Sequence, residues 1–234
     1  MWSFWSLSLL LLQLPFKAMA AGEVPKRLLV LGSSVSTGAG ASDPSTKGWT
    51  ALLYQALKGH GFEYRNEGIG GTQVDAWNDL LRQGKYTKHL ERFGIVIMSL
   101  SLGNEGLPYQ DEAEHIAAIE EHYLKGLRSI VQILRDHMLP GARLVLGGPY
   151  PNDMYADKHL AVLQRVLAAT RKWKEVDYVI DFLHEAVHDG NGRWHHNCSV
   201  DPGHPNDDGH RQMFECVELA QVLGPERAET MADL

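Results

Sequence analysis

The sequence has few of the features expected of a nucleic-acid-binding or multidomain protein. Its 22 lysines and arginines are dispersed and are outnumbered by 29 aspartates and glutamates, which gives a net charge of -7. Nucleic-acid binding requires clustered basic residues, so it is not expected, and a polyanionic substrate is disfavoured as well. No internal repeat and no linker divides the 234 residues. The chain is therefore expected to form one globular domain with a substantial buried core.

The chain also lacks a hydrophobic run long enough to span a membrane. The uncharged, leucine-rich run Trp2–Phe16 is shorter than the roughly 20 apolar residues of a spanning helix. The A-x-A cleavage pattern Ala18-Met19-Ala20 follows it, although no lysine or arginine precedes it. We therefore predict a secretory signal peptide at residues 1–20, a single domain at 21–224 and a flexible tail at 225–234. The protein is then secreted or lies in the secretory lumen; an uncleaved membrane anchor is the alternative.

Cysteine is scarce, with only Cys198 and Cys216 present. In an exported protein these two residues can form a disulfide, which would tie the segment before the last helix to that helix. Two free buried thiols are an equally ordinary outcome, so both interpretations stay open. Asn197-Cys198-Ser199 also matches the N-glycosylation sequon, which matters only if the host glycosylates.

Apolar runs and helical patterns alternate along the chain. The predicted strands are Leu28–Leu31, Phe62–Arg65, Ile95–Leu100, Arg143–Leu146 and Tyr178–Ile180. The predicted helices are Trp49–Leu57, Val74–Leu81, Ala113–Met138, Ala156–Trp173 and Gly209–Leu223. Several strands are apolar throughout, which is typical of strands covered on both faces. The alternation predicts an α/β fold with three α/β/α layers and a five-stranded parallel sheet.

The segment Asp201-Pro-Gly-His204-Pro-Asn206 places a carboxylate and an imidazole three residues apart, just before a predicted helix. Asp201 can accept a hydrogen bond from Nδ1–H of His204, which leaves Nε2 free to take a proton from a nucleophile. Ser34 offers that nucleophile, because Gly32-Ser33-Ser34 follows the first predicted strand. The pattern therefore predicts a catalytic triad of Ser34, His204 and Asp201.

Acyl transfer also needs donors for the oxyanion that develops on the carbonyl oxygen. A backbone N–H in a glycine-rich turn is suitable, and Gly71 follows the second strand in such a turn. A side-chain amide is suitable too, and Asn104 follows the third strand. Since the carboxyl ends of parallel strands meet at one edge of the sheet, we expect all these segments to converge there.

These segments resemble the four sequence blocks of the SGNH hydrolase superfamily, also called GDSL esterases and lipases. They occur in the family's order and span nearly all of the chain after residue 20: Gly32-Ser33-Ser34, Asn66 to Gly71, Leu102 to Glu105, and Asp201 to Asn206. The resemblance implies a flavodoxin-like sheet and ester hydrolysis without a metal or cofactor. It also implies that the N–H groups of Ser34 and Gly71 and the Asn104 side chain form the oxyanion hole.

Three positions depart from the family's pattern. Ser33 replaces the aspartate before the nucleophile, Leu102 replaces the first glycine of the third block, and Glu105 replaces its aspartate. None of these changes removes a catalytic atom, but together they indicate a divergent member. The expected activity is hydrolysis of a carboxylic ester of the short-acyl or O-acetyl type, and the oligomeric state is left open. Because no long insertion suggests a lid, a small soluble ester is favoured.

Other function classes remain as alternatives. His184-Glu-Ala-Val-His188 matches the zinc-protease pattern, in which two histidines on one helix face bind the metal. Glycines at 190 and 192 would end such a helix at once, and Trp194 stands where the extended motif has its third histidine. A zinc hydrolase is thus one alternative. An acyltransferase or a non-catalytic binding module on the same scaffold is another.

The remaining aromatic residues and histidines give weaker indications. Trp49, Tyr150 and Tyr155 either line an acyl or sugar pocket or serve only in packing. Seven histidines on or beside predicted helices are expected mostly at the surface: His60, His89, His115, His122, His137, His159 and His210. Glycines 38 and 40 resemble part of a dinucleotide-binding loop, but that loop's third glycine and the Walker lysine are missing, so nucleotide binding is not expected.

Overall fold

The computed structural model describes residues 24–229. The predicted signal peptide therefore lies outside the described residues, as do residues 230–234 of the predicted tail. The first part of that tail, Pro225–Glu229, forms the short helix α8.

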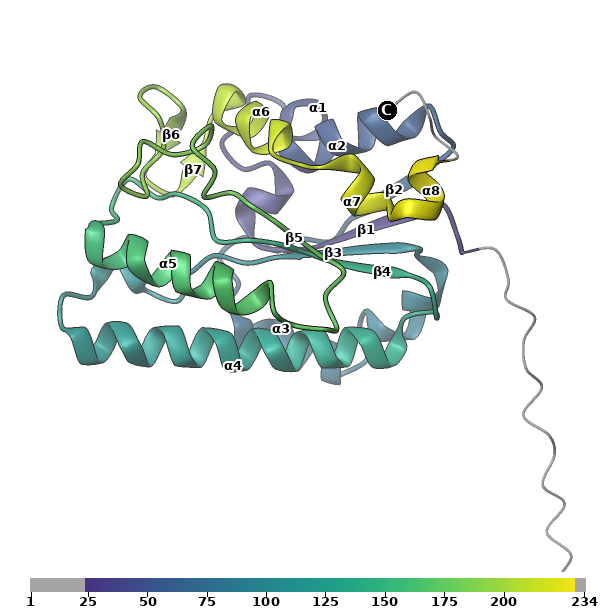
Figure 1. Cartoon of the computed structure of the whole chain (residues 1–234), viewed down its shortest axis with the longest axis horizontal. Helices are drawn as coiled ribbons and strands as arrows, with labels where there is room; N and C mark the ends of the chain where they lie inside the picture. Colours follow the sequence, from purple (N-terminus) through teal and green to yellow (C-terminus); the bar gives the residue numbers. More distant parts are fainter. Residues whose placement is uncertain (1–23, 230–234) are drawn as a thin grey trace, which may run out of the picture.

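Five parallel strands form the central sheet, in the spatial order β2-β1-β3-β4-β5 (Figure 1). Their bounds are β1 Arg27–Gly32, β2 Glu63–Asn66, β3 Ile95–Ser99, β4 Arg143–Gly147 and β5 Tyr178–Ile180. The prediction of a five-stranded parallel sheet is confirmed, and every predicted strand boundary lies within one residue of the observed one.

Helices cover both faces of the sheet, which confirms the three-layer architecture (Figure 1). One layer contains α3 (Val74–Arg82), α4 (Ala113–His137) and α5 (Asp157–Thr170). The opposite layer contains α1 (Pro44–Lys47), α2 (Trp49–Lys58), α6 (Asp207–Glu215), α7 (Leu219–Leu223) and α8. Three short 3-10 helices complete the connections: η1 Ser34–Thr37, η2 Thr87–Arg92 and η3 Leu107–Tyr109.

The two helical layers explain why the central strands are mostly apolar on both of their faces. Successive side chains of a strand point to opposite faces of the sheet. Leu29 and Leu31 belong to the core formed with α3, α4 and α5, whereas Leu28 and Val30 belong to the core formed with α2, α6 and α7. All four are at least 97% buried. Burial of each such side chain stabilises the fold by roughly 1.5–3 kcal/mol, so the strand contributes to both cores.

The last helix is predicted incorrectly as one continuous element. The structure has α6, which ends at Glu215, and α7, which begins at Leu219. Cys216 N–H donates to Met213 O at 3.3 Å, and Val217 N–H donates to Phe214 O at 2.9 Å. These bonds to the third preceding residue tighten the chain and end α6. The apolar pattern continues across the break because Met213 and Val217 pack into the same core, which is why periodicity alone missed the break.

The two cysteines are free thiols in the structure, so the disulfide interpretation is wrong. Cys198 is buried and Cys216 is half-buried. Burial raises the pKa of the Cys216 thiol to about 11, with smaller contributions from the nearby Asp181 and Glu215 carboxylates. At neutral pH this thiol therefore stays protonated and unreactive.

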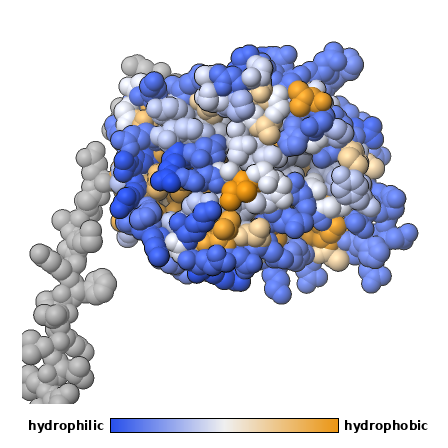
Figure 2. All heavy atoms as spheres, turned by 180° about the vertical axis from the view of Figure 1, so that it is seen from behind, coloured by the Kyte–Doolittle hydropathy of each residue, from blue (hydrophilic) through white to orange (hydrophobic). Residues whose placement is uncertain are grey.

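The described residues expose few large hydrophobic side chains. No helix between residues 24 and 229 has the length and hydropathy needed to cross a membrane. Figure 2 shows one face that is mainly hydrophilic, with apolar residues in small separate patches. The large hydrophobic residues that are exposed in the described part are Tyr109, Met154 and Val200. Tyr109 and Met154 border the cavity that contains Ser34, so these two exposed apolar groups lie at the candidate site.

Candidate active site

The turn that carries Ser34, the predicted nucleophile, begins where β1 ends. Gly32 has φ 151°, and a Cβ at this position would lie 2.1 Å from Ser99 O, so only glycine fits between the two strands. The next residue, Ser33, is fully buried, and its N–H donates to Ser99 O at 3.0 Å. Ser34 then starts η1, and its side chain reaches the cavity at the carboxyl edge of the sheet. Glycine and a buried serine thus fix the position of Ser34.

The other half of the site lies on a small hairpin rather than on a plain loop. Strands β6 (Ser199–Asp201) and β7 (His204–Pro205) pair antiparallel across a tight turn at one end of the molecule (Figure 1). The Oδ1 atom of Asp201 accepts the N–H of Gly203 at 2.9 Å and that of His204 at 3.0 Å. Nδ1 of His204 donates to both Asp201 carboxylate oxygens at 2.9 Å. The hairpin therefore holds the imidazole with its proton on Nδ1.

Opposing effects act on the Asp201 carboxyl group. Partial burial raises its pKa, but hydrogen bonds from the His204 ring and from the Gly203 N–H outweigh this effect and hold the pKa below its ordinary value. Asp201 is consequently ionised at neutral pH, as a group that stabilises an imidazolium must be.

The structure brings Ser34 and His204 together across 170 residues of sequence. Nε2 of His204 lies 2.9 Å from Oγ of Ser34, which is hydrogen-bonding distance. With the ring proton held on Nδ1, Nε2 is the acceptor and the serine hydroxyl is the donor. The three side chains form the hydrogen-bonded series that a serine hydrolase requires.

Two contacts hold the segment after η1 against the hairpin and the start of α6. Gly40 has φ 96°, and a Cβ there would lie 2.1 Å from Pro205 O, so the backbones approach as closely as glycine permits. Asp207, at the start of α6, accepts the N–H of Ser42 at 2.7 Å and its hydroxyl at 2.8 Å. Gly40 therefore serves this close approach and not a dinucleotide loop.

His210 makes a third contact between the two ends of the chain, although it was predicted at the surface. It is fully buried, and burial lowers the pKa of its ring. The neutral ring donates from Nε2 to Ala39 O at 3.0 Å and accepts the Trp49 N–H at Nδ1 at 3.4 Å. His159 is also buried, with Nε2 donating to Gln110 O at 2.9 Å. The prediction fails for these two histidines because each ring has backbone partners.

The predicted oxyanion donors lie close to Ser34. A Cβ added to Gly70 would be 3.8 Å from Cβ of Ser34, so the Gly70-Gly71 turn runs alongside the serine. Gly71 adopts φ 73°, and within residues 24–229 no hydrogen bond from its N–H to another group is found. Asn104 lines the cavity, and its Nδ2 donates one hydrogen to Thr72 O at 3.0 Å. The second amide hydrogen is left for a ligand.

Two of the family-motif positions hold these donor segments in place. Asn66 donates from Nδ2 to Ser36 O at 2.7 Å and accepts the Gly68 N–H at 2.9 Å, which links the second block to η1. Glu105 accepts the Val74 N–H at 2.9 Å at the start of α3. Burial raises the pKa of the Glu105 carboxyl. Glutamate at position 105 is thus an anchor for α3, which sequence reasoning did not foresee.

The candidate cavity has a volume of about 250 Å³ and contains Ser34, Asn104 and His204. Among the described residues that line it, none is lysine or arginine. Of the three aromatic residues considered from the sequence, only Tyr150 lines it. Trp49 and Tyr155 are buried in the two cores, so the pocket interpretation is wrong for them and the packing interpretation is confirmed.

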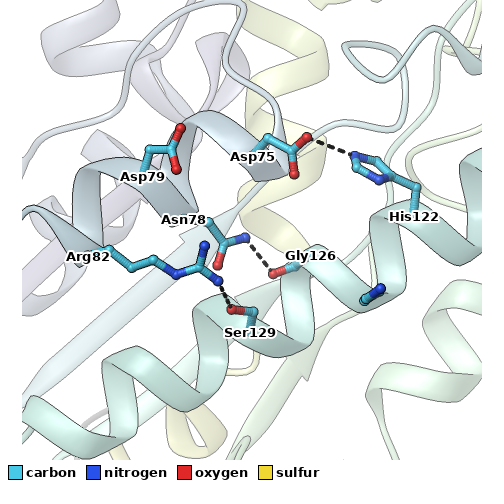
Figure 3. Close-up of a pocket in the computed structure, with 8 residues that line it drawn as sticks. Asp75, Asn78, Asp79, Arg82, His122, Gly126 and Ser129 are labelled. Atoms are coloured by element: carbon cyan, nitrogen blue, oxygen red, sulfur yellow. Dashed lines mark hydrogen bonds and ion pairs between the residues drawn. The ribbon is translucent and has the colours of Figure 1, made fainter.

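A larger cavity of about 420 Å³ lies between α3 and α4 (Figure 3). Its walls carry charged side chains, including Asp75 and His122, which lie 3.4 Å apart. Arg82 donates to Ser129 Oγ at 3.1 Å on the same wall. None of the predicted catalytic residues lines this cavity, and no serine there contacts a histidine base. Chemistry rather than volume therefore identifies the smaller cavity as the candidate active site.

The zinc-protease pattern does not form a metal-binding arrangement. Residues 184–188 lie in turns and not on a helix. Nε2 of His188 donates to Leu183 O at 2.7 Å, and Nδ1 accepts the Gly190 N–H at 3.0 Å, so both ring nitrogens are used. Nδ1 of His184 accepts the Ala186 N–H at 3.1 Å. These contacts give the two histidines a structural role in the segment after β5.

Comparison with known proteins identifies a family and a shared fold. Residues 30–212 match the family model described as the GDSL-like Lipase/Acylhydrolase family. The solved structure of TesA is 24% identical over 85% of this chain and 98% of that protein, with a TM-score of 0.62.

Two further solved structures share the fold. The lipase Lip_vut3 from a goat rumen metagenome is 16% identical over 84% of this chain and 97% of its own, with a TM-score of 0.64. The acetylxylan esterase Axe2 from Geobacillus stearothermophilus, solved as a catalytic mutant, is 16% identical over 84% and 93%, with a TM-score of 0.54. No curated protein matches the chain.

Proposed function

The chain belongs to the GDSL-like lipase/acylhydrolase family and is a carboxylic ester hydrolase, and on this basis we propose that Ser34, His204 and Asp201 cleave a small neutral ester. The observation that carries the proposal is the 2.9 Å contact between Nε2 of His204 and Oγ of Ser34. It joins a hydroxyl to a base whose other ring nitrogen is already held by a carboxylate, which is the arrangement that activates serine.

The reaction follows from these positions. Oγ of Ser34 attacks the ester carbonyl carbon while Nε2 of His204 takes the hydroxyl proton, and Asp201 stabilises the imidazolium. The N–H groups of Ser34 and Gly71 and the Asn104 amide stabilise the oxyanion. When the C–O bond to the alcohol breaks, His204 returns its proton to the departing oxygen. Water then attacks the acyl-enzyme with the same base, which releases the carboxylic acid and restores the Ser34 hydroxyl.

The lining of the cavity supports a small, uncharged substrate. At about 250 Å³ the cavity is below the range of about 300–1,000 Å³ that holds drug-sized ligands. The cavity offers no cation to a phosphate or carboxylate among its described lining residues, and its rim carries the exposed apolar side chains of Tyr109 and Met154. These features favour a short acyl or aryl ester. Acetylated sugars also meet the size limit.

The substrate proposal predicts a clear order of rates with p-nitrophenyl esters. We expect kcat/KM for the acetate and butyrate to exceed that for the dodecanoate by about tenfold or more, since the cavity cannot enclose the long chain. The anionic mono-p-nitrophenyl succinate should also react about tenfold more slowly than the butyrate, because no cation compensates its carboxylate. Faster turnover of the dodecanoate or the succinate would contradict the proposed substrate class.

The same assay separates the serine mechanism from the zinc alternative. Hydrolysis should continue in the presence of a chelator and should stop after treatment with a serine-directed phosphonate. Loss of activity with the chelator alone would contradict the proposed mechanism. Hydrolysis and acyl transfer proceed through the same acyl-enzyme, so addition of a second alcohol to the assay tests whether the chain also transfers the acyl group.

Replacing Asn104 with alanine tests the oxyanion role. Loss of one oxyanion donor costs roughly 10²–10³-fold in kcat, so we expect a fall of about 10²-fold in Asn104→Ala with KM little changed. Asn191→Ala, on an exposed loop, serves as the matched control and should keep the wild-type kcat. Circular dichroism and a melting curve verify that both variants fold. A folded Asn104→Ala protein with wild-type turnover would show that the amide has no part in catalysis.

The location of the protein remains part of the proposal. The leucine-rich run and the A-x-A pattern before residue 21 support export through a secretory pathway. Expression of the full chain with a C-terminal tag, followed by mass measurement of the mature N-terminus, tests this. A mature protein that retains residues 1–20 would contradict cleavage.

A further inference from the structure

A series of buried hydroxyl groups connects two segments of the active site. Oγ of Ser33 lies 3.2 Å from Oη of Tyr150, and the Ser101 side chain lies close enough to the Tyr150 phenol to lower its pKa against the larger effect of burial. Oγ of Ser101 in turn accepts the Gly103 N–H at 3.0 Å. Ser33 is fully buried, Tyr150 is 5% exposed and Ser101 is 7% exposed. The proposed mechanism uses none of these hydroxyls.

The network joins the two segments whose spacing matters most for catalysis. Ser33 directly precedes the nucleophile Ser34, and Gly103 directly precedes the oxyanion donor Asn104. Tyr150 follows β4, which lies on the far side of β3 from β1 in the sheet order. A single phenol thus bridges the segment after β1 and the segment after β3. We propose that Tyr150 is a positioning residue that sets the distance between Ser34 and Asn104, a role that rests on the proposed function.

The chemistry of the phenol suits this role. A tyrosine hydroxyl donates one hydrogen bond and accepts others, so Tyr150 can pair with Ser33 and Ser101 together in either direction. Burial raises the pKa of the phenol, so it stays neutral and keeps its donor at neutral pH. The ring is held by stacking on Trp194, with centroids 6.3 Å apart and planes inclined by 26°. A fixed ring makes the hydroxyl a fixed reference point for both serines.

The departure from the family motif at position 33 gives the network its significance. The family has aspartate before the nucleophile, whereas this chain has a serine whose hydroxyl is completely removed from water. A buried hydroxyl requires a hydrogen-bond partner, and the partner found for it in the described residues is Tyr150. In this chain the neutral hydroxyls of Ser33 and Tyr150 therefore stand together where the family has the carboxylate of an aspartate.

The test is Tyr150→Phe, which removes the hydroxyl and keeps the ring. Misplacement of reacting groups by about 1 Å can cost 10²-fold in rate, so for a smaller shift we expect kcat on p-nitrophenyl acetate to fall about tenfold and KM to stay within about twofold. The rate of phosphonate labelling of Ser34 should fall by a similar factor. Unchanged kcat in a folded Tyr150→Phe protein would overturn the proposal.

Two further variants separate positioning from loss of stability. Tyr123→Phe removes another buried tyrosine hydroxyl near the same end of the sheet, one that donates to Leu100 O at 3.3 Å. It should lower the melting temperature comparably but leave kcat unchanged. If Tyr123→Phe lowers kcat as much as Tyr150→Phe does, the effect belongs to general destabilisation and the proposal fails.

Ser33→Ala completes the test and remains informative if Tyr150→Phe does not fold. Because both changes break one connection, the fall in kcat in the double variant should be smaller than the product of the two single effects. Fully additive effects, or wild-type kcat in Ser33→Ala, would overturn the proposal. The outcome is distinct from failure of the proposed function itself, in which the wild type would lack esterase activity or Ser34→Ala would retain it.

Discussion

Replacing Ser34 with alanine is expected to lower kcat for ester hydrolysis by at least about 10⁴-fold, the largest effect of any single change in this chain. The variant has no hydroxyl to form the acyl-enzyme, so only the oxyanion donors and substrate binding remain. The fold should be unaffected, because Oγ of Ser34 makes its hydrogen bond to His204 at a partly exposed site. Steady-state hydrolysis of p-nitrophenyl acetate, together with mass spectrometry after phosphonate treatment, measures both expectations.

The neighbouring serine provides the sharpest comparison. Ser33→Ala should keep measurable turnover and should still be labelled by the phosphonate at Ser34, whereas Ser34→Ala should show neither. Ser129→Ala, on α4, should behave as the wild type and serves as the control for removal of a serine hydroxyl elsewhere. If the phosphonate labels Ser33 or any residue other than Ser34 in the wild type, the nucleophile is wrongly assigned.

Replacing Asp201 with asparagine is expected to reduce kcat by roughly 10³–10⁴-fold, since an amide cannot stabilise the imidazolium and favours the wrong tautomer of His204. KM should change much less, because Asp201 acts on the base rather than on the ester. Asp208→Asn, on the first turn of α6, removes an exposed carboxylate close by and should leave kcat near the wild-type value. A folded Asp201→Asn protein with kcat within about tenfold of the wild type would exclude Asp201 as the partner of the base.

The same substitution has a signature in the dependence of stability on pH. The folded-state pKa of Asp201 lies below its ordinary value of about 3.9. Ionised Asp201 therefore stabilises the fold at pH values above the unfolded pKa, and this stabilisation is lost as the pH falls through the folded pKa. The free energies of unfolding of the wild type and of Asp201→Asn, measured with urea, should consequently approach each other as the solution is acidified toward pH 3. Divergence on acidification would contradict the sign of the shift.

The sheet could be predicted from local apolar patterns. The meeting of Ser34 and His204 at its edge could be predicted because parallel strands end at the same edge of a sheet. Strands such as Ile95–Ser99 are buried at every position and almost entirely apolar, and parallel strands place their carboxyl ends together. Only two residues separate Asp201 from His204, so the pair could be recognised without any knowledge of the fold. The place after β1 indicated the Gly-Ser-Ser turn, and the family resemblance selected Ser34 rather than Ser33 within it.

The remaining features depend on partners that are distant in sequence. The hydroxyl of Ser33 lies beside that of Tyr150, which is 117 residues away, and no spacing rule connects them. His210 lies on a helix with polar neighbours, so nothing in its local sequence indicated that Ala39 O and Trp49 N–H would take up both ring nitrogens. The break between α6 and α7 was not predicted for a related reason. Side chains before and after the break pack into the same core, so the apolar pattern does not change there.

The long sequence separation between Ser34 and His204 also bears on when the proposed activity can first arise during synthesis. Ribosomes add roughly 5–20 residues per second, so the 170 residues between Ser34 and His204 correspond to about 10–30 s of synthesis. During that interval β1 to β5 can assemble while Ser34 still has no base. A nascent polypeptide that stops before residue 201 therefore carries the Ser34 hydroxyl without its proposed base, and hydrolysis by the proposed triad is not expected until residue 204 has been synthesised.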